Sequence, residues 1–351
     1  MVPYFSPDYG HARSRFREAV SRAGGQLTVL PIAAKAPGGQ DLSIDVGWFG
    51  AANPTRALVH VSGVHGVEGF AGAAIQLQWL DDALPAPPEA CAVILLHVVN
   101  PYGMAWLRRV NEHNVDLNRN CLPSPGRYTG APEGYEAVRD FLNAPGRSGF
   151  DWFAIKAVRL IWRFGLPTLH QAIAGGQYVD PTGLFFGGTS LEEGPRRVRD
   201  WVRQRLGAVT HLIGIDVHTG LGRYGTDALL VDEVPGTPAF EAVRTIFGKS
   251  LAQLDPHRSA AYRATGLFGA LFHEALPHAD VQFVVQEFGT YHALRVLRAL
   301  RSENRSFHHG DGAAKSTLLK VFVPRDDRWR RAVLGRGRAT IGEAWQWLNS
   351  R

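Results

Sequence analysis

The 351-residue sequence lacks several features that would place it in a specialised class. It has only two cysteines, Cys91 and Cys121, which are too few for a disulfide framework or for a zinc site made of cysteines. No apolar run reaches 18 residues, so no stretch predicts a membrane-spanning helix. The first 16 residues contain no apolar core of the kind that a signal peptide has, and we therefore expect a cytoplasmic protein.

Lysine is also scarce, which limits what the net charge of +6 implies. Only five of the 38 basic residues are lysine, and the arginines are scattered along the chain. A nucleic-acid interface needs basic residues gathered on one surface, so we expect no nucleic-acid partner and keep a basic nucleic-acid binder only as an alternative. With 45% hydrophobic and 20% charged residues, the chain has the composition of a globular protein with a sizeable core.

Four short apolar runs, each followed by polar or glycine-rich residues, indicate the fold class. They cover residues 57–61, 91–99, 211–217 and 281–286. Near-continuous hydrophobic runs that alternate with helical stretches are typical of buried parallel strands. We therefore predict a single α/β domain with a mixed, largely parallel central sheet flanked by helices. Because ligands of such sheets bind at the carboxyl ends of the strands, we expect the polar residues after these runs to meet in one pocket.

The rest of the chain fits this plan except for one long segment. Between residues 123 and 201 the pattern breaks down, and we predict an insertion within a single domain of residues 1–351 that covers the sheet edge. A basic and aromatic helix over 152–164 could suit a membrane surface, but packing on the domain with a solvated basic edge is the simpler expectation, so no membrane partner is predicted. We also predict an opening helix capped by Ser6 or Asp8, extended segments at 26–32 and 42–49, and helices at 70–80 and 243–254.

His65 and Glu68 are candidate metal ligands. They follow the first run at a helix start, where side chains three residues apart can turn to one point. Zinc in hydrolases typically takes three ligands from His and Asp or Glu and leaves a fourth position for water. His218, directly after the third run, is the candidate third ligand, although a histidine hydrogen-bonded at a loop start is the better explanation when His218 is taken alone. Asp216 lies on the same face and could orient a ligand or be a plain loop carboxylate.

Two further sites carry candidate catalytic groups. Glu287 ends the fourth run, where partial desolvation favours a raised pKa and work as a general base, although an ion pair with an arginine is the alternative. Residues 109–120 form an unusually polar stretch with two arginines and interleaved Asn and Asp. A guanidinium group there could clamp a carboxylate or polarise a carbonyl.

The order of these motifs carries a resemblance to a known family. H-x-x-E, then R-x-N-x-x-x-V-D-L-N-R-N, then a strand-end His and a strand-end Glu resemble the zinc carboxypeptidase superfamily. The local sequences SGVHGVEGFAG and EFGT resemble more closely a bacterial branch of this superfamily that is catalogued as a domain of unknown function. The resemblance implies that His65, Glu68 and His218 hold one zinc ion.

The resemblance also implies the remaining roles. Arg109 would polarise the scissile carbonyl, Asn118 and Arg119 would grip a substrate carboxylate, and Glu287 would be the base that activates water together with zinc. Tyr262 is the nearest candidate for the tyrosine that carboxypeptidases place upstream of this Glu. The implied function is zinc-dependent cleavage of an amide bond next to a carboxylate-bearing group, in a small molecule or a peptide. An aspartoacylase-like N-acyl amino acid deacylase and a non-catalytic binding protein are the alternatives, and the oligomeric state stays open.

Overall fold

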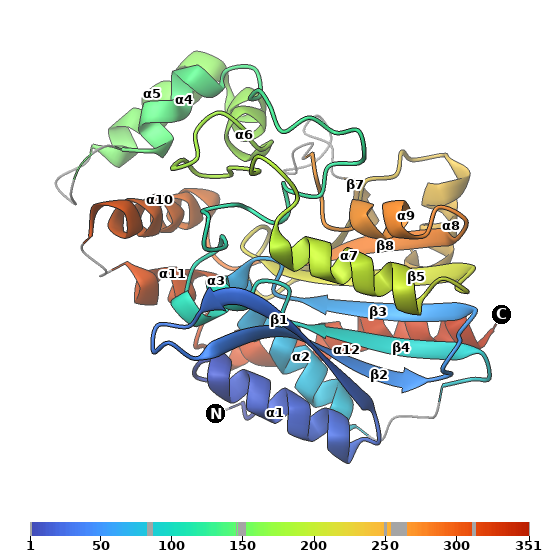
Figure 1. Cartoon of the computed structure of the whole chain (residues 1–351). Coiled ribbons are helices and arrows are strands. Elements are labelled where there is room, and N and C mark those ends of the chain that lie inside the picture. The colour runs from blue at the N-terminus through green and yellow to red at the C-terminus, as the bar shows by residue number, and fades with distance from the viewer. Residues whose placement is uncertain are drawn as a thin grey trace.

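One sheet of eight strands, in the order β1-β2-β4-β3-β5-β8-β6-β7, forms the centre of the computed structural model (Figure 1). The structure describes residues 2–82, 87–144, 146, 152–248, 251–253, 265–310 and 314–350. The strands are β1 (Gln26–Lys35), β2 (Asp41–Gly50), β3 (Arg56–Ser62), β4 (Cys91–His97), β5 (His211–Thr219), β6 (Asp227–Val231), β7 (Leu251–Gln253) and β8 (Asp280–Phe288). The helices are α1 (Tyr9–Arg22), the 3₁₀ turn η1 (Gly66–Glu68), α2 (Gly69–Asp81), α3 (Pro101–Trp106), α4 (Tyr135–Leu142), α5 (Phe153–Phe164), α6 (Leu166–Ala174), α7 (Glu193–Arg205), α8 (Pro238–Phe247), α9 (Ala270–Ala275), α10 (Ala293–His309), α11 (Lys315–Phe322) and α12 (Asp327–Asn349).

The pairing of the strands confirms the predicted fold class. The four central strands, β4, β3, β5 and β8, run parallel to one another, and they coincide with the four apolar runs of the sequence, the second of which continues two residues past β4. Strands β1 and β2 join one side in antiparallel orientation, and β6 joins the other side antiparallel to β8. Because the central strands are parallel, their carboxyl ends lie at one edge of the sheet, where the site residues follow.

Helices cover both faces of the sheet, which explains the continuous hydrophobicity of its central strands. Helices α2 and α12 pack on one face, and α1 packs beside α2 (Figure 1). On the other face, Phe272 of α9 packs against Phe283 of β8, with ring centroids 5.2 Å apart, and α7 packs against α9. Helix α1 begins at the predicted cap, since the Asp8 side chain accepts the N–H of His11 at 2.8 Å.

The predicted helix over 243–254 is wrong over 251–253, which form a strand, while residues 249, 250 and 254 lie outside the described residues. Helix α8 ends at Phe247, and Gly248 follows with a φ of +70°, a conformation that ends helices and that glycine adopts without strain. The chain then forms β7, whose backbone pairs with β6. The sequence prediction did not include β6, because its five residues give too short a run to separate from a loop.

Helices α4, α5 and α6, here called the cap helices, come from the segment expected to be an insertion, and they lie beside α10 (Figure 1). They share a small hydrophobic core of their own, against which Leu294 and Leu297 of α10 pack. In α5, Phe153 and Ala157 are buried, whereas Trp162 on the outer side is 88% exposed. Among the residues that the structure describes, no helix combines the length and apolar character needed to span a bilayer.

Candidate active site

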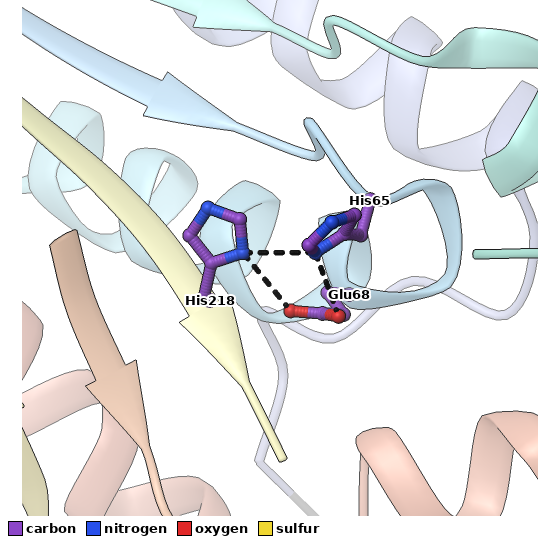
Figure 2. A group of neighbouring side chains, drawn as sticks. All are labelled: His65, Glu68 and His218. Atoms are coloured by element: carbon purple, nitrogen blue, oxygen red, sulfur yellow. Dashed lines mark hydrogen bonds and ion pairs between the residues drawn. The ribbon is translucent and has the colours of Figure 1, made fainter. Parts of the chain in front are cut away.

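Three side chains proposed from the sequence as metal ligands lie together at the carboxyl ends of β3 and β5 (Figure 2). The Nδ1 atom of His65 lies 3.0 Å from Oε1 of Glu68 and 3.0 Å from Nδ1 of His218. The same His218 nitrogen lies 3.4 Å from Oε2 of Glu68. All three side chains are buried, and one ligand atom from each lies within 4.8 Å of the others. The two imidazoles and the carboxylate can therefore face a single ion.

The opposite ring nitrogens of the two histidines are held by carboxylates. Nε2 of His65 lies 2.8 Å from Oδ1 of Asp116, and Nε2 of His218 lies 2.8 Å from Oδ2 of Asp216. When each Nε2–H donates to its carboxylate, each Nδ1 carries a lone pair directed at the shared centre. Lone pairs that converge in this way repel one another unless a proton or a cation lies between them. Zinc fits this donor set, and the carboxylates behind the imidazoles are the partners that ring-nitrogen ligands of zinc usually have.

The charges around the cluster also favour a cation. Burial opposes the charged form of Glu68, but its interactions with His65, His218 and Arg109 outweigh burial and hold the pKa of this carboxyl well below its usual range. Asp116 behaves in the same way, since His65 and Arg109 keep its pKa low despite full burial. Burial alone would lower the pKa of His218, but Asp216 and Glu68 raise it well above the ordinary value. The surroundings therefore stabilise positive charge at this point.

The turn that carries His65 and Glu68 packs closely against α3 through Gly66. A Cβ on Gly66 would lie 2.1 Å from the carbonyl carbon of Gly103 in α3, so no larger residue fits without movement. The N–H groups of Gly66 and Val67 donate to the carbonyl oxygens of Arg109 and Arg108, at 3.0 and 2.8 Å. These bonds join the H-x-x-E turn to the start of the polar stretch 109–120, so the two motifs form one structural unit.

Glu287 lies next to His218 across the sheet. The two residues are direct partners in the parallel register of β5 and β8, and their side chains therefore point to the same face. Oε1 of Glu287 accepts the N–H of Leu221 at 2.8 Å. Burial and, secondly, the negative charge of Glu68 raise the pKa of Glu287 to about 7. A carboxyl with this pKa can take up and release a proton near neutral pH, as a general base must.

Arg109 and Thr219 complete the polar surroundings. Nη1 of Arg109 donates to Oε1 of Glu68 at 2.9 Å, and its Nε donates to Oδ2 of Asp116 at 3.1 Å. The N–H of Thr219 donates to Oε2 of Glu68 at 2.7 Å, while its buried hydroxyl has no hydrogen-bond partner in the described part of the chain. The sequence analysis assigned no role to Thr219 or to Asp116. Their only signals are their places directly after His218 and inside the polar stretch.

The residues expected to grip a substrate carboxylate lie in different surroundings. Asn118 lines the cavity beside the cluster, and its Oδ1 accepts the N–H of Phe268 at 2.8 Å. Arg119 is fully buried, with Nη1 donating to the carbonyl of Asn118 at 2.6 Å, and it is not among the described residues that line the cavity. Tyr262 lies outside the described residues. The structure thus brings Asn118 to the cavity but not Arg119.

The cavity beside the cluster has a volume of about 240 Å³ and a lining of two kinds. One part of the lining consists of the polar groups described above. The rest is apolar, with side chains from the cap helices and α10 and, from other elements, Phe185, Leu221, Leu230, Leu267, Val285 and Phe322. The polar lining residues are His65, Glu68, Arg109, Asn118, His218, Thr219 and Glu287.

Comparison with known families assigns the chain to one of them. A family model described as "Protein of unknown function (DUF2817)" matches residues 5–336, which is nearly the whole chain. The chain belongs to this family. The prediction of a branch catalogued as a domain of unknown function is thereby confirmed. No curated protein matches the sequence.

Several solved structures are similar to this DUF2817 protein over most of its length. Carboxypeptidase A from Helicoverpa armigera has 15% sequence identity and a TM-score of 0.47, with 93% of this chain and 73% of that chain covered. A metallo-carboxypeptidase from Burkholderia cenocepacia has 12% identity and a TM-score of 0.46, with 96% and 68% covered. The murein-tripeptide amidase MpaA from Escherichia coli O157 has 16% identity and a TM-score of 0.39, with 86% and 93% covered.

Proposed function

We propose that this chain is a zinc-dependent hydrolase that cleaves an amide bond next to a carboxylate-bearing group. The observation that carries the proposal is the convergence of His65, Glu68 and His218, whose ligand atoms lie within 4.8 Å of one another at one end of a cavity. Two imidazoles and one carboxylate form a donor set that catalytic zinc sites use while a further position stays open. Glu287, with its pKa raised to about 7, lines the same cavity and supports a hydrolytic role.

The residues of the chain have distinct parts in the proposed reaction. A metal ion bound by this donor set supplies Lewis acidity, which polarises a carbonyl and lowers the pKa of water. Glu287 accepts a proton from the attacking water as a carbon–oxygen bond forms at the amide carbonyl. The carbon–nitrogen bond then breaks, and Glu287 returns the proton to the leaving amine, which gives a carboxylic acid and an amine. The guanidinium of Arg109 stabilises the negative charge that develops on the carbonyl oxygen.

Two neutral groups complete the proposed substrate contacts. The Thr219 hydroxyl, which has no hydrogen-bond partner in the described structure, hydrogen-bonds to the substrate beside the reacting carbonyl. Asn118 binds the polar end of the substrate, the task that the family resemblance implies for Asn118 and Arg119 together. The full burial of Arg119 favours a supporting part for its side chain, behind the cavity wall.

Metal content and hydrolysis, measured on the same preparation, test this proposal. We expect one zinc per chain, together with hydrolysis of members of a panel of N-acyl amino acids and peptides. The activity should disappear with a chelator and return with added zinc. Zinc-loaded protein that hydrolyses no amide in the panel would instead identify a binding protein, and a chain that retains no zinc would refute the proposed metal site.

The variant Glu287→Gln tests the base separately from the metal. The amide keeps the shape of the side chain but cannot accept and return a proton, so we expect full zinc content and loss of turnover. Glu343→Gln, which changes a carboxyl on α12 away from the cavity lining, is the matched control and should retain activity. A fully active Glu287→Gln protein would show that another group is the base.

A further inference from the structure

The part of the cavity that the cap helices and α10 line, here called its apolar half, has helical walls. Phe141 of α4, Leu160 and Ile161 of α5, and Leu294 and Leu297 of α10 line it. Backbone N–H and C=O groups inside helices are already bonded to each other, and these side chains carry no polar atoms. This half of the cavity therefore offers its occupant very few hydrogen bonds.

The scarcity of hydrogen-bonding groups in the apolar half distinguishes peptide substrates from substrates that carry an aliphatic chain. An extended peptide carries one N–H and one C=O per residue, and each costs free energy when it is buried without a partner. An aliphatic chain carries neither, and its burial against Leu, Ile and Phe side chains is favourable. The apolar lining therefore favours a hydrocarbon tail, rather than further peptide units, on the carbonyl side of the scissile bond.

The size of the cavity limits the length of the tail. An engineered cavity of about 150 Å³ with apolar walls holds a benzene ring of six carbons. Scaled in the same way, the whole volume of about 240 Å³ has room for about ten carbons, and because part of it belongs to the polar half, the tail itself is limited to on the order of six to eight carbons. The helix that forms one wall is apolar on its outer side too, where Ile155 and Val158 are 58% and 64% exposed.

We propose that the substrate is an N-acyl compound whose medium-length aliphatic acyl chain occupies the apolar half of the cavity, between α5 and α10. The cleaved amide lies at the polar end, and the amine portion, which bears the carboxylate, lies towards Asn118. This inference rests on the proposed function, and among the two amide hydrolases considered from the sequence it selects the N-acyl amino acid deacylase. Hydrolysis of such a compound releases a fatty acid and an amino acid.

Binding of the fatty acid product tests the cavity without any need for catalysis. Calorimetric titration of the zinc-loaded protein with butyrate, hexanoate, octanoate and decanoate should show affinity that rises about fourfold for each methylene until the cavity is full. Leu160→Trp should weaken the binding of decanoate at least tenfold, because the indole occupies the tail position. Leu297→Trp narrows the cavity from the opposite wall and should act likewise. Val158→Trp, on the exposed side of the same helix, is the control and should bind decanoate as the wild type does.

Equal affinity for butyrate and decanoate, or no effect of either filling variant in protein with an unchanged melting temperature, would overturn the acyl-chain proposal. Kinetics on N-acetyl, N-hexanoyl and N-decanoyl forms of one amino acid then separate the two proposals. We expect kcat/KM to rise with chain length in the same way. If short and long amides are cleaved equally, or if the rate follows the side chain of a peptide substrate, hydrolase function survives and the acyl pocket fails. If decanoate binds with the expected length dependence but no amide is cleaved, the pocket stands and the hydrolase proposal fails.

Discussion

Replacement of Asp116 by Asn tests whether the carboxylate behind His65 prepares this histidine to bind a metal. In the structure, Asp116 accepts a hydrogen bond from Nε2 of His65 at 2.8 Å through one oxygen, and from Nε of Arg109 at 3.1 Å through the other. An asparagine amide cannot serve both, because it has one acceptor and one donor end. If the NH₂ end faces Arg109, two donors oppose each other. If it faces His65, Nε2 must become the acceptor, and the proton moves to Nδ1, where it blocks the metal.

The expected magnitude follows from this conflict. Loss of a carboxylate partner behind a metal-binding histidine typically weakens metal affinity about 10–100-fold, or about 1.4–2.7 kcal/mol. Because Asp116 is fully buried and both of its oxygens are used, we expect a value near the upper end of that range. Water cannot readily take over the lost hydrogen bond at such a buried position.

Competition for zinc between the metal-free protein and a chromophoric chelator measures this change directly. The matched control is Asp45→Asn, which alters another fully buried carboxylate paired with an arginine, Arg17 on α1, but lies on β2 away from the cluster. We expect that control to change the free energy of unfolding and leave zinc affinity unchanged. Zinc affinity within twofold of wild type in a folded Asp116→Asn protein would refute the reasoning about the histidine tautomer.

Three further predictions follow from the same structure. Arg109→Ala should lower kcat about 10²–10³-fold at saturating zinc, because the oxyanion loses its charged donor, and an unchanged kcat would contradict this role. Burial lowers the pKa values of His60 and His97 from 6.5 to about 3, so the unfolded chain takes up protons below pH 6.5 that the folded chain does not, and stability falls as the pH drops. At pH 5 this proton uptake lowers the free energy of unfolding by about 2 kcal/mol for each of the two histidines. In His97→Asn one of them is gone, so the decrease in the free energy of urea unfolding between pH 7.5 and 5 should be about 2 kcal/mol smaller than in the wild type. Equal decreases in the two proteins would refute this. Gly66→Ala should destabilise the protein by about 1–3 kcal/mol in the same assay, since its Cβ would overlap the backbone of α3, whereas Gly342→Ala, with nothing within 4 Å, should not destabilise it.

The central sheet could be predicted from the sequence because its strands are buried on both faces. Such strands read as unbroken apolar runs, and the polar residues that interrupt them mark the strand ends. His65, His218 and Glu287 were found in this way, as residues at three strand ends that lie far apart in the sequence. The edge of the sheet could not be predicted so well. A strand of three residues such as β7 is defined by its pairing with β6, and this pairing leaves no periodic signal in the sequence.

The surroundings of the cluster were harder to foresee than the cluster itself. Asp116 lies 51 residues from His65, and only the packing of two loops brings them together. Arg119 carries the same functional group as Arg109 and lies in the same motif, yet its side chain is fully buried and is not among the described residues that line the cavity. Sequence spacing alone does not reveal which way a side chain points when the chain forms irregular turns. The direction of these residues therefore depended on contacts that only the folded chain contains.

The small separate core of the cap helices has a consequence for how this family can diversify. The groups proposed to perform the reaction come from the ends of sheet strands and the loops that follow them, whereas much of the apolar wall comes from helices that pack chiefly among themselves and on α10. Mutations in those helices can enlarge, shorten or reshape the wall while the strand ends stay in place. Evolution could thus adapt the choice of compound independently of the chemical step, and family members with unlike cap helices should differ in what they accept rather than in the reaction they perform.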